Sequence, residues 1–242
     1  ILQLYFKETI RVETSSYFSG VLYNLSRLYI SNTSSDRTLP LHKSVLLEKD
    51  ATEISMQLSE VERVASILRS GTHGGDGASV TLSMDTRAFV DVALNAINAV
   101  ANIHVTEFRD TVRPVAVSAK LLLGTGVLIV TFSEVVNVIY GQRIHLANVS
   151  LVSDISMGAN AIVFSDTTKY YKQSQRINIS LTEQERAKAI SLSSTPGGDN
   201  TTLYLDTYVN SSADISGNPS LGKTSIIVFE VPDAIPPRIL GI

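Results

Sequence analysis

Acidic side chains recur at matching positions along the chain. The matching pairs are Glu8/Glu134, Asp76/Asp199, Asp91/Asp214, Glu107/Glu230 and Asp110/Asp233. Carboxylates are ligands that calcium prefers, and calcium takes six to eight oxygen atoms. Asp110 and Asp233 each precede a proline-containing joint, where such a cation could sit. Because no Asp-x-Asp-x-Asp-Gly loop is present, we favour the alternative, in which these side chains accept hydrogen bonds in turns and caps.

Asparagine occurs in several Asn-x-Ser/Thr triplets, which accept N-linked glycans in secreted proteins. The triplets begin at Asn24, Asn32, Asn148, Asn178, Asn200 and Asn210. A chain rich in Ser and Thr also produces such triplets by chance. Asn24 and Asn148 are equivalent in the repeat described below. We interpret several of these residues as glycosylated, which implies passage through a secretory pathway and an extracellular or cell-surface location.

The side chains that usually carry catalysis are scarce. The four histidines, His42, His73, His104 and His145, have no histidine at the equivalent repeat positions and lack the spacing of a metal site. The absence of cysteine excludes thiol catalysis and thiolate metal sites. No nucleophile elbow, P-loop or dinucleotide fingerprint is present. We therefore predict no catalytic residue and no cofactor, and we predict that the chain is not an enzyme.

The composition excludes two further classes of function. Hydrophobic residues make up 44% of the chain, charged residues 18%, and the net charge is −3. Lys and Arg are dispersed and tryptophan is absent, so a nucleic-acid-binding face is not expected. No apolar run reaches the ~18 residues of a membrane helix, so this segment is predicted to have no membrane span. The apolar content suffices to bury a core without disulfides.

A sequence repeat organises the chain. Residues 58–114 align without a gap on residues 181–237, with an offset of 123. Upstream segments align with slightly larger offsets, as Phe6-Lys-Glu8 does on Phe132-Ser-Glu134. Such a period is the signature of tandem modules.

The repeat also predicts where the modules begin and end. We expect a first module at 1–112 that lacks its first strand, a complete module at 113–235, and the first strand of a following module at 236–242. Because Ile1 opens directly on strand-like alternation, without an initiator Met or signal peptide, we expect an excerpt of a longer protein. Either a neighbouring segment fills the gap in the first module by strand addition, or the chain is simply cut inside a repeat.

Alternation of apolar residues predicts short strands in both modules. They are Leu2 to Ile10, Glu53 to Leu58, Ser79 to Met84, Ala101 to Phe108, Gly126 to Phe132, Arg176 to Leu181, Thr201 to Leu205 and Ser225 to Val231. One short helix interrupts them in each module. Capping boxes at Ser59-x-x-Glu62 and Thr182-x-x-Glu185 predict helices that run to about Leu68 and Ile190. The fold class is therefore all-β, with β-sandwich modules and one capped helix in each.

The segments Val127-Leu-Ile-Val-Thr-Phe-Ser-Glu-Val135 and Asp214-Ile-Ser-Gly-Asn-Pro219, with the Asp-x-x-Pro-Pro joint, resemble the tandem Ig-like repeats of large surface proteins. Similar modules occur in bacterial adhesins, surface-layer proteins and large secreted proteins of protists, including flagellar-hair (mastigoneme) proteins. The resemblance implies a structural glycoprotein of an extracellular filament, whose partners are copies of itself or neighbouring modules. The alternative is an adhesin or carbohydrate-binding stalk.

Overall fold

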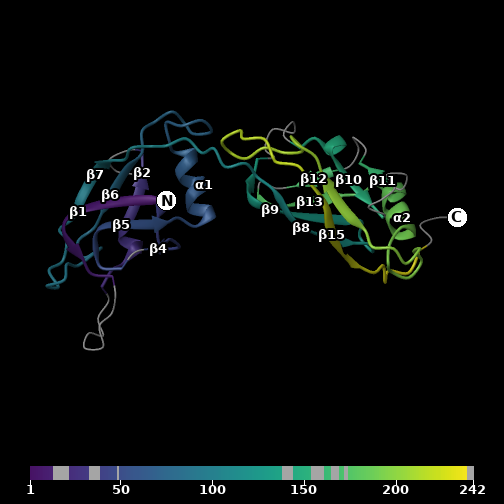
Figure 1. Cartoon of the computed structure of the whole chain (residues 1–242), viewed down its shortest axis with the longest axis horizontal. Coiled ribbons are helices and arrows are strands. Elements are labelled where there is room, and N and C mark those ends of the chain that lie inside the picture. The colour runs from purple at the N-terminus through teal and green to yellow at the C-terminus, as the bar shows by residue number, and fades with distance from the viewer. Residues whose placement is uncertain are drawn as a thin grey trace. The chain divides into compact units, whose positions relative to one another are not determined.

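The structure is a computed structural model that describes residues 1–12, 22–32, 39–47, 49–137, 144–153, 161–164, 169–171 and 174–238. The chain divides into two compact units, Ile1–Asp110 (unit 1) and Thr111–Ile242 (unit 2). The division falls two residues before the sequence-based boundary. The described residues are mostly β-sheet with two short α-helices (Figure 1), so the predicted β-rich class is confirmed. Neither of these helices is long and apolar enough to cross a membrane.

Unit 1 contains two antiparallel sheets. The first has the order β1-β5-β4, with β1 (Leu2–Ile10), β5 (Ala51–Gln57) and β4 (Val45–Leu46). The second has the order β3-β2-β6-β7, with β3 (Leu39–Pro40), β2 (Leu28–Ser31), β6 (Thr81–Met84) and β7 (Val100–His104); the 3-10 helix η1 (Leu25–Arg27) precedes β2. Leu4 and Leu28, from opposite sheets, belong to one buried cluster, so the sheets pack on each other.

Unit 2 forms one continuous eight-stranded sheet among its described residues. The order is β11-β10-β14-β15-β8-β9-β13-β12. Its elements are β8 (Ala116–Leu122), β9 (Val127–Val136), η2 (Leu146–Asn148), β10 (Val149–Val152), β11 (Ala161–Val163), β12 (Lys169–Tyr171), β13 (Ser174–Ser180), β14 (Tyr204–Thr207) and β15 (Lys223–Val231). Leu121, Leu151 and Ile177 lie in one core cluster, so the sheet encloses a single core.

Strand β15 joins the two layers of unit 2. Its first half pairs antiparallel with β14, where Leu205 lies opposite Ile226. Its second half pairs in parallel with β8, where Ala119 lies opposite Val228. The layers of the expected sandwich are therefore connected through a shared strand.

Local sequence signals position the two helices. In α1 (Glu60–Leu68) the Ser59 side chain accepts the Glu62 amide while Glu62 accepts the Ser59 amide. In α2 (Glu183–Ser191) Thr182 and Glu185 make the same reciprocal bonds. Both predicted capping boxes are confirmed, because each satisfies amides that a helix start leaves without partners.

A tight glycine turn follows each helix. Gly77 and its counterpart Asn200 adopt positive φ angles of 87° and 65°. Gly75 and its counterpart Gly198 pack against the end of the preceding helix, where an added Cβ would overlap the backbone carbonyl oxygen of Ser70 or Ser193. The turn therefore requires glycine at these two positions because of close backbone approach.

We predict that Gly75→Ala destabilises unit 1 by about 1–3 kcal/mol, because the new methyl group forces the backbone of the helix end to move. Gly71→Ala is the matched control, since a Cβ there meets its nearest neighbour at 3.6 Å without positive φ. Urea unfolding of both variants measures the difference. Equal midpoints for the two variants would contradict the packing argument.

Candidate functional site

In each unit, one arginine binds two acids, and one of these acids lies at the end of the unit. In unit 1, Arg63 on α1 binds both carboxylate oxygens of Glu60 at 2.7 and 2.8 Å and an oxygen of Asp110 at 2.6 Å. Asp110 is the last residue of the unit. The helix therefore holds the point at which the chain leaves unit 1.

Unit 2 repeats this arrangement with equivalent residues. Arg186 on α2 binds Glu183 at 2.6 and 2.8 Å and Asp233 at 2.8 Å. Its guanidinium also donates to the carbonyl oxygen of Leu123 at 3.1 Å, just after β8. We call these two groups the arginine clamps. The Asp in each clamp lies 47 residues from its arginine, so no local sequence pattern reveals the pairing.

The clamps shift the titration of their members. The bond from Glu60 raises the pKa of Arg63, and Glu183 followed by Asp233 raises the pKa of Arg186. Arg186 lowers the pKa of Glu183. The Ile235 amide and then Arg186 lower the pKa of Asp233. Glu183 and Asp233 therefore stay charged at neutral pH, and their pairings with Arg186 persist.

A second recurring acid, Glu107 in unit 1 and Glu230 in unit 2, binds backbone amides that are distant in the sequence. Glu107 accepts the amides of Gly71 and Val80 at 2.9 and 2.6 Å. Its counterpart Glu230 accepts the amides of Ser194 and Leu203, both at 2.8 Å. Glu107, three residues after β7, and Glu230, on β15, thus each tie the segment after the helix to the end of the unit. This satisfies backbone donors that lie outside the sheet ladders.

A third recurring acid closes a loop. Asp91 accepts the backbone and side-chain amides of Asn95, both at 2.8 Å, and these bonds lower the pKa of Asp91. Asp214 accepts the same two bonds from Asn218 at 2.7 and 2.8 Å. The repeated Asp-x-x-x-Asn spacing was the sequence signal for this loop, although the role of the asparagine was not recognised from it.

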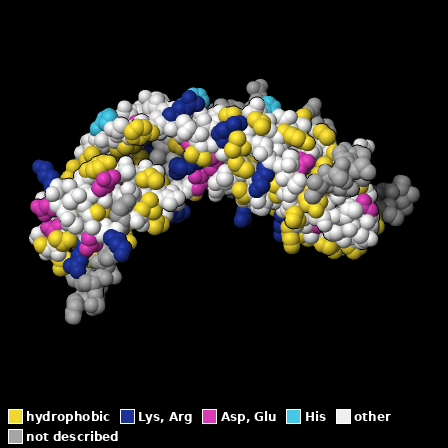
Figure 2. All heavy atoms as spheres, viewed as in Figure 1, with side chains coloured by type: hydrophobic (Ala, Val, Ile, Leu, Met, Phe, Trp, Pro, Cys, Tyr) yellow, Lys and Arg dark blue, Asp and Glu magenta, His cyan; other side chains and the backbone are white. Residues whose placement is uncertain are grey.

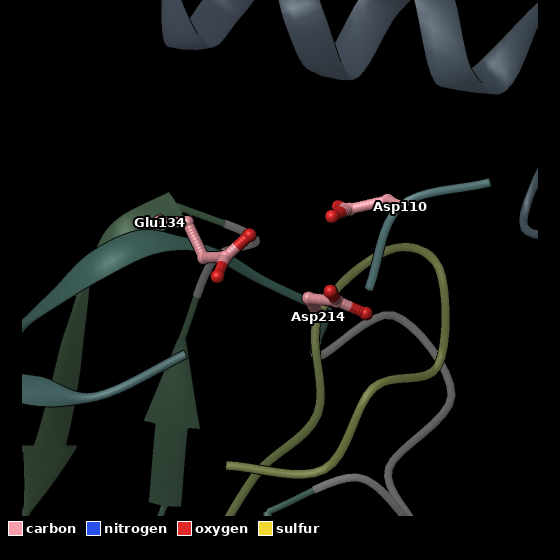
Figure 3. Close-up of side chains that lie close together, drawn as sticks. All are labelled: Asp110, Glu134 and Asp214. Atoms are coloured by element: carbon pink, nitrogen blue, oxygen red, sulfur yellow. The ribbon is translucent and has the colours of Figure 1, made fainter. Parts of the chain in front are cut away.

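Each of these aspartates lies beside a glutamate, which is on β1 in unit 1 and on β9 in unit 2. Glu8 contacts Asp91 in unit 1. In unit 2 a carboxylate oxygen of Glu134 lies within 4.8 Å of one on Asp214, and both residues are buried, with exposed fractions of 5% and 0% (Figure 3). Figure 3 also labels Asp110, which pairs with Arg63. The carboxylates of Glu134 and Asp214 supply fewer oxygens than the six to eight that calcium takes, so calcium binding stays a prediction.

The structure separates the candidate glycosylation residues into two groups. Asn178, Asn200 and Asn210 are exposed. Asn24 is half-buried and caps η1, where its side-chain oxygen accepts the Ser26 amide at 3.1 Å. The remaining two are also half-buried and donate their side-chain amides, Asn32 to Asp76 at 2.5 Å and Asn148 to the Val209 carbonyl at 3.3 Å. A glycan at either residue replaces one of the two N–H groups of that bonded amide.

Outside the clamps, the basic residues and the histidines are spread over the surface. All four histidines, His42, His73, His104 and His145, are exposed. Figure 2 shows Lys and Arg side chains scattered over the visible face of each unit. The repeated groups of the described residues are thus acids that hold backbone amides or arginine, an arrangement that stabilises a fold.

Neither a family model nor a curated protein matches the sequence of this chain at a significant level.

We predict that Arg186→Gln raises the pKa of Glu183 and, to a smaller extent, that of Asp233, which keeps its bond from Ile235. In the wild type both folded-state pKa values lie below the unfolded ones. The stability they contribute is therefore present above the unfolded pKa and is lost as pH falls through the folded pKa.

Carbon-detected NMR titration of the side-chain carboxyls measures the shifts. Asp199 serves as the internal control, because its lowered pKa comes from bonds to Thr201. An unchanged Glu183 titration in Arg186→Gln would refute the clamp.

Proposed function

We propose that this chain is a non-catalytic structural segment of a large secreted glycoprotein, in which tandem Ig-like β-sandwich modules build an extracellular filament or surface appendage. The observation that carries the proposal is the arginine clamp, made by the same residue types at the same spacing in both units. It holds the acid at the end of each module against that module's helix.

A module whose C-terminal end is held in place suits a structural scaffold. Asp110 and Asp233 are followed within four residues by Pro114 and Pro237. Proline restricts its own backbone and that of the preceding residue, so such a joint is short and stiff. A clamp before a stiff joint limits the directions in which the next module can leave. Tandem modules joined in this way form an extended array of repeating surfaces.

The roles of the other recurring acids also support a structural function. Glu107 and Glu230 hold backbone amides, and Asp91 and Asp214 close loops. Each of these contacts satisfies a polar group of the fold. A repeated enzyme would be expected to repeat a nucleophile or base as well.

The secreted glycoprotein part of the proposal makes a site-specific prediction. When the chain is produced with a signal peptide in eukaryotic cells, we expect glycans at Asn178, Asn200 and Asn210, whose side chains are exposed. We expect lower occupancy at Asn32 and Asn148, whose side-chain amides are bonded in the fold. Enzymatic deglycosylation in ¹⁸O-water followed by peptide mass spectrometry measures each occupancy. Secretion of an unglycosylated chain would remove the glycoprotein assignment.

Immuno-electron microscopy tests the filament. Antibodies against residues 1–242 should label extracellular filaments or appendages of the source cells, at repeated positions along them. Label confined to soluble particles or to the cell interior would reject the filament. Saturable binding of the chain on a glycan array, together with label at the cell surface alone, would favour a carbohydrate-binding stalk.

A further inference from the structure

Unit 1 has an open apolar groove where unit 2 has a strand. The groove has a cavity volume of about 580 Å³. One wall is residues 1–6 on β1, and the other is the segment after β7, including Val105 and Phe108; Leu82 and Met84 on β6 contribute apolar side chains. Phe108 at the groove is 87% exposed.

Strand β8 occupies the corresponding place in unit 2. It runs antiparallel to β9, with Ala119 opposite Val130 and Leu122 opposite Val127. On its other edge it runs parallel to β15, with Ala119 opposite Val228 and Leu122 opposite Val231. The side chains of Ala116, Ala119 and Leu121 on β8, and of Leu123 just after it, are buried in the core.

The walls of the groove are the repeat counterparts of the strands that hold β8. Offsets of 126 and 123 place residues 1–6 on 127–132 and residues 105–108 on 228–231. Backbone pairing supports these offsets, because Ile10 bridges Asp91 in unit 1 as Val136 bridges Asp214 in unit 2. The lining of the groove is thus the same set of positions that contacts β8.

The strand edges at the groove lack a sheet partner among the described residues. β1 pairs on one side, with β5, and β7 pairs on one side, with β6. β7 ends at His104, whereas β15 continues through residues 228–231, the stretch that pairs with β8. Open strand edges with apolar flanks are ready to accept another strand.

We propose that this groove binds one extended β-strand with the residue pattern of β8. The inference rests on the proposed tandem-module function. The strand lies antiparallel to β1 and parallel to β7. Its counterpart of Ala119 pairs with Leu4 and Val105, and its counterpart of Leu122 pairs with Ile1 and Phe108.

The chemistry of the walls favours a peptide over a small apolar ligand. Backbone N–H and C=O groups on two strand edges require a backbone that pairs with both at once. The buried residues of β8 alternate with exposed Val117, Ser118 and Lys120. Alanine and leucine both occur at the inward positions of this strand. The occupant therefore has small and large apolar residues on one face and polar residues on the other.

A synthetic peptide of residues 112–124 tests this inference on the 242-residue chain. At a peptide concentration about ten times its dissociation constant, exchange should slow roughly tenfold at those amides of residues 2–6 and 106–108 that face the groove. The equivalent amides of 128–132 and 229–231 that face β8 are already paired and serve as the internal control. The control peptide carries Leu121→Asp, which places a charge on the buried face, and it should give no protection.

Three outcomes overturn the proposal. They are no protection by the β8 peptide, equal protection by both peptides, and concentration-dependent dimers in which the groove-facing amides of residues 2–6 and 106–108 are protected without peptide. The last result would assign the groove to a second copy of this chain. Protection by the peptide without filaments in the microscope would preserve the groove assignment and reject the filament. Filaments without protection would do the reverse.

Discussion

The parallel pairing of β8 with β15 is the contact on which the architecture of unit 2 depends. It joins the antiparallel layer of β9 and β13 to that of β10 and β14, so one sheet encloses one core. The amide of Leu123, just past β8, continues the pairing by donating to Val231 at 3.0 Å. The carbonyl of Leu123 then accepts from Arg186. These hydrogen bonds and the clamp of Arg186 therefore link the end of β8 to β15, to α2 and to Asp233 at the end of the module.

The repeated acids explain how each unit holds its irregular segments. Loops expose backbone amides that sheet ladders do not pair, and buried amides without partners are costly. Glu230 accepts two of them, including that of Leu203, whose side chain is fully buried. Asp199 and Asp76 accept amides two residues ahead in the glycine turns. These acids recur because the turns recur, and this is the role favoured from the sequence.

Local signals were predictable from the sequence, and long-range pairings were not. The capping boxes at Ser59 and Thr182 predicted both helices to within one residue, because caps depend on neighbours three positions away. The segment 86–101, whose repeat counterpart contains Gly and Pro, forms turns and isolated bridges and has no helix. The strand expected to begin at Thr201 begins at Tyr204, since the Leu203 amide is taken by Glu230. No local pattern reveals that partner, 27 residues away.

The position of β8 in the chain gives its pairing a mechanical meaning. β8 is the first strand of unit 2 and β15 is the last, and they lie side by side and parallel. Tension applied through the two ends of the unit pulls these strands in opposite directions along their axes. Their hydrogen bonds are then loaded together, in shear, and must yield together, whereas bonds opened from one end of a hairpin yield one at a time. In unit 1 the groove between β1 and β7 takes the place of this strand, so the same resistance there requires the strand that the groove is shaped to accept.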